Sequence, residues 1–364
     1  EAEREQGITI DVAYRYFATP RRKFIIADTP GHVQYTRNMA TGASTANVAI
    51  ILIDARLGVL QQSRRHAYIA SLLGIPNLVV AVNKMDLRGY AQDVYDAIRA
   101  EFTEFCSRLS FREVRFFPIS ALKGDNVVNP SPSTPWYDGG TILEYLETVD
   151  IDSDRNFADF RFPVQYVLRP NLDYRGFAGQ IAAGTVRVGD TLKVLPSGKS
   201  SRVTSIDTYG GPLDEAFTPQ SVTIRLADEI DISRGDMLVK PDNLATVSQS
   251  FDATVVWMHE EPLDVGKTYL IKQTTRYVPV TVNTVNWKAD LETLERRPAA
   301  QLELNDIGSL RIVAHRPLVF DPYKRSRSTG AFIIIDSLTN LTVAAGMIAD
   351  GSDDGASGAL ASAG

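Results

Sequence analysis

The segment Leu78-Val-Val-Ala-Val-Asn83-Lys-Met-Asp86 places a short polar motif directly after a continuous apolar run. Three similar runs, rich in branched residues, occur in the first part of the chain: Lys23–Asp28, Val48–Asp54 and Arg115–Ser120. Continuous runs of this kind are typical of strands covered on both faces. Between them, apolar residues recur at helical spacing in Gln61–Leu73 and Gln92–Leu109. This alternation predicts a parallel, doubly wound α/β sheet, whose ligands bind at the carboxyl ends of the strands.

Three motifs lie at those carboxyl ends, and we expect their strands to be neighbours in one sheet. They are, in chain order, Asp28-Thr-Pro-Gly31-His32, Asn83-Lys84-Met-Asp86 and Ser120-Ala121. The second motif alone would also suit a polar loop after a strand. With the other two beside it, the pattern predicts a GTP-binding domain of the P-loop type, with a γ-phosphate sensor and a guanine-reading pocket.

The second and third motifs supply the predicted guanine pocket. Asp86 can accept both the ring N–H and the exocyclic amine of guanine, whereas adenine would leave a carboxylate oxygen unpaired. Asn83 can bond the other edge of the base and tie neighbouring loops together, and the Lys84 stem can lie along the ring or sugar. Ser120-Ala121 predicts a tight turn whose backbone N–H meets the guanine carbonyl oxygen.

The first motif supplies the predicted phosphate end of the site. Asp28 would hold Mg²⁺ through water, and Gly31 would offer its backbone N–H to the γ-phosphate, which requires close approach. His32 stands where a GTPase places the catalytic residue that positions water; the alternative is a surface loop histidine. Thr9, in Gly7-Ile-Thr-Ile-Asp11, would give its hydroxyl oxygen to Mg²⁺, the alternative being an ordinary strand threonine.

One expected motif, the phosphate loop Gly-x-x-x-x-Gly-Lys-Ser/Thr, does not precede these segments. The Gly198-Lys199-Ser200 triplet lacks the first glycine, because Lys193 stands there, and it lies in a hairpin-like turn rather than before a helix. We therefore expect the phosphate loop, with its strand and helix, to lie upstream of Glu1. The sheet of this chain would then lack a central strand.

From about residue 158 the pattern changes to short strands separated by turn signals such as Gly189-Asp190. Two consecutive sets of strands, 158–248 and 249–349, predict two small β-barrels joined near Asn243–Ser250. They follow a GTP-binding domain at 1–157 that is truncated at its N-terminus. Residues 350–364 have the Gly, Ser and Ala composition of a flexible linker or tail.

Length and composition exclude several other classes of protein. A chain of 364 residues suggests two or three domains, and the net charge of −6 does not suit a general nucleic-acid or membrane binder. The single cysteine, Cys106, excludes a disulfide framework and a thiolate metal cluster. The sequence shows no signal peptide and no apolar run long enough to span a bilayer, which predicts a cytoplasmic protein.

A GTPase domain followed by two β-barrels resembles the translational elongation factors of the Tu type. The segments Glu3–Ile10 and Asn38–Ala43 are similar in sequence to that superfamily. Longer stretches are similar to one branch, the GTPase (large) subunit of bacterial sulfate adenylyltransferase, or ATP sulfurylase: Ile26–Met39, Arg64–Gly74, Ser120–Val128, Phe162–Val167, Leu195–Lys199, Asp231–Asp236 and Ser328–Asp336. These stretches cover the chain nearly from end to end.

The resemblance implies a role in sulfate assimilation and cysteine biosynthesis. A partner small subunit would make adenosine 5′-phosphosulfate and pyrophosphate from ATP and sulfate, and this subunit would bind and hydrolyse GTP to drive that reaction. Coupling would pass through switch segments around Thr9 and from Asp28 to Met39. Some members of the family continue into an adenylylsulfate kinase domain, to which the tail could lead.

Two other functions remain open from the residues. An elongation factor carrying aminoacyl-tRNA would share the fold and the GTP site, but tRNA binding needs a basic stripe. The barrels instead mix acidic and basic residues, as in the acidic stretch Leu226–Asp231. The second alternative is a regulatory GTPase with no coupled metabolic reaction. Binding of tRNA or of a sulfurylase small subunit separates these functions.

Overall fold

The computed structural model describes residues 12–29, 36–151, 156–171 and 174–350. The chain divides into two compact units. One comprises Glu1–Ser153 with Ala289–Arg296, and the other comprises Asp154–Lys288 with Arg297–Gly364. Each unit is considered by itself below.

The first unit contains a parallel sheet of three strands, β3 (Val48–Asp54), β4 (Asn77–Asn83) and β5 (Glu113–Pro118), with β4 in the middle. A separate antiparallel pair is formed by β1 (Ala13–Ala18) and β2 (Lys23–Asp28). The helical elements are α2 (Thr36–Ala43), α3 (Gln61–Leu72), the 3₁₀ turn η2 (Met85–Arg88), α4 (Gln92–Cys106) and α5 (Ile142–Thr148). The predicted strands and helices of this unit are therefore confirmed, with ends that differ by a few residues.

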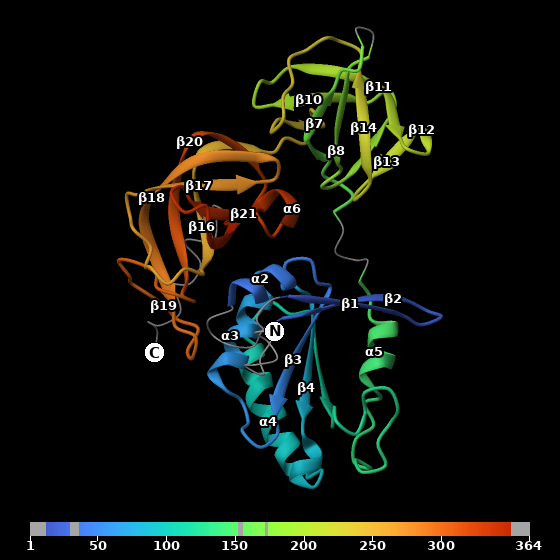
Figure 1. Ribbon diagram of the computed structural model, residues 1–364, viewed down its shortest axis with the longest axis vertical. Coiled ribbons are helices and arrows are strands. Elements are labelled where there is room, and N and C mark those ends of the chain that lie inside the picture. Colours follow the sequence, from blue (N-terminus) through green and yellow to red (C-terminus); the bar gives the residue numbers. More distant parts are fainter. Residues whose placement is uncertain (1–11, 30–35, 152–155, 172–173, 351–364) are drawn as a thin grey trace, which may run out of the picture. The chain divides into compact units, whose positions relative to one another are not determined.

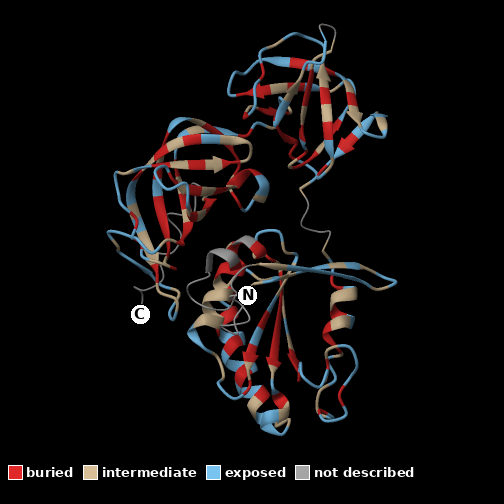
Figure 2. Ribbon diagram, in the orientation of Figure 1, coloured by how far each residue is buried: buried red, intermediate tan, exposed pale blue. Residues whose placement is uncertain are grey.

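Helices cover both faces of this sheet, as a doubly wound fold requires (Figure 1). One face packs against α3 and α4 through a core that includes Val80 and Val82 of β4 and Phe102 of α4. The other face packs against α5, where Val79 and Ala81 meet Tyr145. Both faces of β4 are buried (Figure 2), which explains why its sequence is a continuous apolar run.

The expectation that all three motifs follow neighbouring strands of one sheet is wrong for the first motif. β2 pairs only with β1, and within the described residues no strand pairs with the second edge of β3. On β3, Ile50 and Leu52 are 42% and 59% exposed. Within the described residues, β3 is therefore an edge strand with exposed apolar side chains, and the expected lack of a central strand stays a prediction.

The second unit is built of strands, as the sequence predicted. Its first sheet has the order β6-β15-β10-β11-β14-β8-β7, with β12 paired to β11 and a separate β9–β13 pair. The bounds are β6 (Arg161–Pro163), β7 (Tyr166–Leu168), β8 (Gly176–Gln180), β9 (Thr185–Arg187), β10 (Thr191–Leu195), β11 (Ser200–Thr208), β12 (Gly211–Leu213), β13 (Glu215–Phe217), β14 (Ser221–Leu226) and β15 (Met237–Val239). Gly198, with φ of 78°, lies in the tight turn between β10 and β11, so the Gly198-Lys199-Ser200 triplet is a hairpin turn, as predicted.

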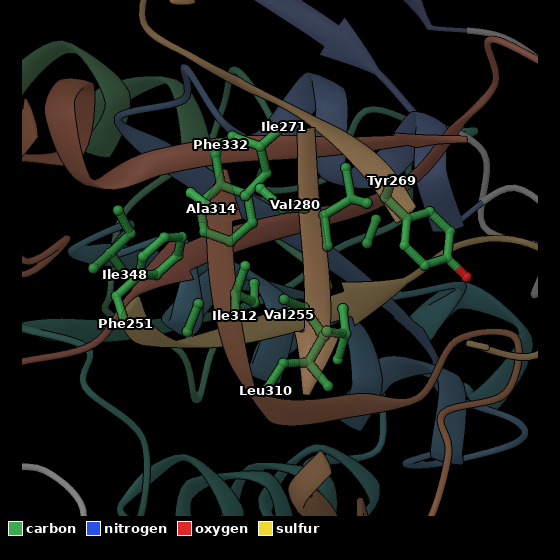
Figure 3. Close-up of a cluster of buried hydrophobic side chains, with 14 of the residues drawn as sticks. Phe251, Val255, Tyr269, Ile271, Val280, Leu310, Ile312, Ala314, Phe332 and Ile348 are labelled. Atoms are coloured by element: carbon green, nitrogen blue, oxygen red, sulfur yellow. The ribbon is translucent and has the colours of Figure 1, made fainter. Parts of the chain in front are cut away.

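Six of the remaining strands close into a barrel in the order β17-β21-β22-β16-β20-β18, because β18 pairs back to β17, and β19 pairs with β18 outside this circle. The bounds are β16 (Thr246–Trp257), β17 (Thr268–Gln273), β18 (Arg276–Ala289), β19 (Arg296–Arg297), β20 (Ile307–Phe320), β21 (Ala331–Asp336) and β22 (Thr342–Ile348), with the short helix α6 (Arg327–Gly330) before β21. Figure 3 shows its core, in which Phe251, Ile312 and Phe332 lie among aliphatic side chains. β16 begins inside Asn243–Ser250, the segment expected to join the barrels.

A buried ion pair connects the two barrel sequences within this unit. Arg161 of β6 donates from Nε and Nη2 to the two carboxylate oxygens of Asp321, each at 2.8 Å, and the side chains are 0% and 2% exposed. Arg161 also donates to the carbonyl oxygens of Phe160 and Asn243, both at 2.9 Å, and Asp321 accepts from the Thr329 hydroxyl at 2.9 Å. All five distances lie within normal hydrogen-bond range, so the buried charges are fully paired.

Candidate functional site: a guanine pocket at the ends of β4 and β5

Asn83 is the residue on which the predicted pocket is built. It is the last residue of β4, and its Oδ1 accepts hydrogen bonds from the backbone N–H of Lys84 at 2.7 Å and of Ala121 at 3.0 Å. A backbone bond from Met85 N to Ile119 O, 3.1 Å long, runs beside them. Asn83 therefore ties the loop after β4 to the loop after β5, as its position predicted, while its Nδ2 remains able to donate to a ligand.

Asp86 lies in the first turn of η2, immediately after this junction. Its side chain is half-buried, and its carboxylate makes no hydrogen bond or ion pair with another residue that the structure describes. Met85, just before it, is fully buried and anchors the turn. Asp86 thus presents two unpaired acceptor oxygens on a fixed backbone, which suits the two neighbouring donors of guanine.

Ser120 and Ala121 form the turn that the sequence predicted. Ser120 is 1% exposed, and its carbonyl oxygen accepts from Gly124 N at 2.8 Å. The N–H of Ala121, however, already donates to Asn83. The N–H of Leu122, a residue that is 91% exposed, makes no hydrogen bond among the described residues. A carbonyl oxygen bound here would therefore share the Ala121 N–H with Asn83 or take the one from Leu122.

Lys84 has a partner that the sequence analysis did not identify. Its Nζ lies 2.9 Å from Oδ2 of Asp54, the last residue of β3, and Asp54 also binds Arg56 through Nε and Nη2. The hydrogen bond from Arg56, joined by Lys84, holds the pKa of the Asp54 carboxyl well below its usual range. The sequence feature that could have indicated this partner is the position of Asp54, because it ends the predicted strand next to β4 just as Asn83 ends β4.

A second support missed in the sequence holds the loop after β5. The Tyr90 hydroxyl bonds to Asp125, whose other oxygen accepts from Ser131 at 2.9 Å. Burial and the bond to Asp125 raise the pKa of Tyr90 to about 12, so the phenol stays protonated. Tyr90 and Asp125 are 35 positions apart in the chain, and Asp125 and Ser131 are 6 apart, so no local sequence pattern predicts these contacts.

The phosphate end of the predicted site is described only in part. Asp28 ends β2 with an exposed side chain, and its carboxylate has no partner among the described residues. A free carboxylate fits Mg²⁺, which commonly binds one or two carboxylates together with water and phosphate oxygens. The described residues contain no group of three or more His, Cys, Asp or Glu arranged so that it could hold a metal ion. Thr9, Gly31 and His32 lie outside the described residues, as does the predicted tail beyond Asp350.

Comparison with protein families places two parts of the chain. Residues 1–155 match the elongation factor Tu GTP-binding domain, and residues 250–349 match the GTP-eEF1A C-terminal domain-like family. Sulfate adenylyltransferase subunit 1 of Bacteroides fragilis is 57% identical over 350 residues, which are 96% of this chain and 74% of the relative. The chain belongs to the sulfate adenylyltransferase subunit 1 family.

Other relatives agree with that membership. Sulfate adenylyltransferase subunit 1 of Shewanella woodyi is 58% identical over 96% of this chain and 74% of its own length. A bifunctional enzyme CysN/CysC of Mycobacterium tuberculosis is 56% identical over 95% of this chain, which corresponds to 58% of that longer protein. The match to a GTP-binding domain identifies the first unit as a guanine-nucleotide-binding domain.

Solved structures support the fold. A crystal structure of sup35 complexed with GDP superposes with a TM-score of 0.51 at 23% identity and covers 92% of this chain and 83% of that one. The architecture of a GTPase domain followed by β-barrels is therefore confirmed. None of the helices in the described part of the chain has the length and apolarity needed to cross a bilayer.

Proposed function

We propose that this chain is the GTP-hydrolysing subunit of a sulfate adenylyltransferase. GTP hydrolysis here drives the formation of adenosine 5′-phosphosulfate and pyrophosphate from ATP and sulfate by a partner small subunit. The proposal rests on the junction at Asn83, beside which the Asp86 carboxylate has no partner among the described residues, in a chain 57% identical to a sulfate adenylyltransferase subunit 1.

In this proposal the base is read by the residues at the ends of β4 and β5. Asp86 accepts the ring N–H and the exocyclic amine of guanine, and Asn83 donates from Nδ2 to its other edge. The turn at Ser120 and Ala121 offers a backbone N–H to the carbonyl oxygen, and the Lys84 stem covers the ring. Adenine would leave one oxygen of Asp86 desolvated and unpaired, which disfavours ATP at this site.

The phosphate end is assigned from the first motif. Asp28 and Thr9 hold Mg²⁺, and Gly31 donates its backbone N–H to the γ-phosphate. Bound Mg²⁺ supplies charge neutralisation at the transferring phosphoryl group. His32 orients the attacking water and is the catalytic residue of the proposal.

The proposed protein works as part of a cytoplasmic heterodimer or larger assembly with the small subunit. A fused adenylylsulfate kinase domain is proposed as an option, because the chain covers 54% and 58% of two longer relatives named bifunctional enzyme CysN/CysC. Neither a membrane nor a nucleic acid is part of this assignment.

The test measures GTP hydrolysis by the full-length protein, with and without a sulfurylase small subunit, ATP and sulfate. Stimulation by the complete mixture, with adenosine 5′-phosphosulfate appearing alongside phosphate, is the expected result. Turnover that ignores the small subunit and sulfate would contradict the proposal. In that case retention of aminoacyl-tRNA would identify an elongation-factor-like carrier, and its absence a regulatory GTPase.

A further inference from the structure

We infer that Asp54 is a positioning residue for the guanine pocket, where it fixes the ammonium of Lys84 so that the lysine stem forms a preset wall for the bound base. The inference rests on the proposed GTP-binding function. It assigns roles to Asp54 and to its partner Arg56, which stand outside the three motifs.

The sheet brings Asp54 to the pocket through its register. Asp54 and Asn83 are paired residues at the ends of the parallel strands β3 and β4, and Ala55 N donates to Asn83 O at 2.9 Å. Two carboxyl ends in register put the Asp54 side chain at the same edge as the loop that carries Lys84. The Nζ–Oδ2 distance of 2.9 Å is that of a charge-assisted hydrogen bond.

The backbone of Lys84 is fixed on both sides, so only its stem is free to move. Lys84 has φ of 64°, a left-handed conformation uncommon for residues other than glycine. Its N–H is held by Asn83, and the following residue, Met85, is fully buried. The remaining freedom lies in the four-carbon stem, and the bond to Asp54 removes it.

Arg56 holds the Asp54 carboxylate in place for this task. Its backbone N–H donates to Oδ1 at 2.9 Å, and its guanidinium reaches both carboxylate oxygens. The Asp54 side chain is 16% exposed, whereas Arg56 and Lys84 are each 46% exposed. Ion pairs this open to water add little to folding stability. Their larger effect is to order a flexible side chain before the ligand arrives, which lowers the entropy lost on binding.

The test compares Asp54→Asn, Lys84→Met and the double variant in the full-length protein. Lys84→Met keeps an unbranched stem and removes the ammonium. Dissociation constants for fluorescently labelled GDP and GTP are measured, with labelled ADP as the selectivity control. Each single variant should bind both guanine nucleotides about two- to tenfold more weakly, the range expected when one long side chain must be ordered on binding.

Coupling between the two residues separates positioning from a general structural effect. The double variant should bind no more weakly than Lys84→Met alone, because Asp54 acts through Lys84. Arg56→Ala should weaken binding in the same direction by a smaller factor. Glu101→Gln, which breaks the Arg64–Glu101 ion pair between α3 and α4, is the matched control and should leave both affinities and the melting temperature unchanged.

Several results would overturn the inference. If Asp54→Asn binds guanine nucleotides as tightly as the wild type or more tightly, the inference is wrong, and the proposed function still stands because the wild type binds them. Additive losses in the double variant would show that Asp54 does not act through Lys84. A wild-type protein that does not prefer GDP over ADP would overturn the proposed function, and this inference with it.

Discussion

Replacing Arg161 with methionine should destabilise the barrel unit by about 3–5 kcal/mol, the usual result of removing one partner of a buried ion pair. Asp321, whose side chain is only 2% exposed, would keep the Thr329 hydroxyl at 2.9 Å as its donor but lose both bonds from Arg161. The carbonyl oxygens of Phe160 and Asn243 would also lose the 2.9 Å bonds that Arg161 donates. Because a folded domain is stable by about 5–15 kcal/mol, this is a large part of the total.

The same reasoning predicts the opposite result for a paired replacement. Arg161→Met combined with Asp321→Leu removes both charges, and buried pairs replaced by apolar residues of similar volume often fold as well as the parent. We expect the double variant to recover most of the loss. If the double variant loses much less stability than the sum of the two single variants, the two side chains act as one unit.

The assay is urea unfolding followed by tryptophan fluorescence in a Trp136→Phe background. The remaining tryptophans, Trp257 and Trp287, both belong to the barrel unit. Arg187→Met is the control, because the Arg187–Glu215 ion pair is 69% and 40% exposed and should contribute less than about 1 kcal/mol. A loss below about 1 kcal/mol for Arg161→Met, or no recovery in the double variant, would refute the reasoning.

Three further predictions concern the nucleotide site and the pH response. Asp86→Asn should weaken GTP binding by at least about 100-fold, since two hydrogen bonds to a charged group are impaired, and xanthosine triphosphate should restore binding in a titration; lack of rescue would count against the pocket. His32→Ala should slow single-turnover GTP hydrolysis with nearly unchanged GTP affinity, and unchanged turnover would remove His32 from the mechanism. Burial, with Arg65 nearby, lowers the pKa of His66 from 6.5 to about 4. The unfolded chain therefore binds the proton more readily, and this contribution to stability is lost as the pH falls from about 6.5 to 4. His66→Gln should reduce the fall in the urea unfolding midpoint between pH 7 and pH 5. An unchanged fall would exclude His66 as the cause of this loss of stability.

The sequence alone predicted most of the local structure. Continuous apolar runs identified β3 and β4, and for β4 the reason is that a strand buried on both faces needs no alternation. Helical spacing located α4, whose Ile98, Phe102 and Phe105 are buried as expected. The motif at Asn83 predicted the link between two loops, since its position at the end of a strand and its side-chain chemistry are both local properties.

Other features depend on residues that only folding brings together. The sequence did not show that Asp54 binds Lys84, 30 positions away, or that Arg161 binds Asp321, 160 positions away. It predicted one sheet for all three motifs, whereas hydrogen bonding leaves β2 paired only with β1. It offered a backbone N–H of the Ser120-Ala121 turn to a ligand, and the structure shows that the Ala121 N–H already donates to Asn83.

The difference between what the sequence predicted and what only the structure showed has a physical cause. Periodicity, turn chemistry and short motifs act between residues close in the chain, so the sequence determines the elements and the chemistry each carries. Ion pairs and strand neighbours depend on which elements lie side by side, and the energy of each pair depends on how much water the fold removes from it. The sequence therefore determined which residues form the proposed guanine pocket, and the tertiary structure decided which residues hold them in place.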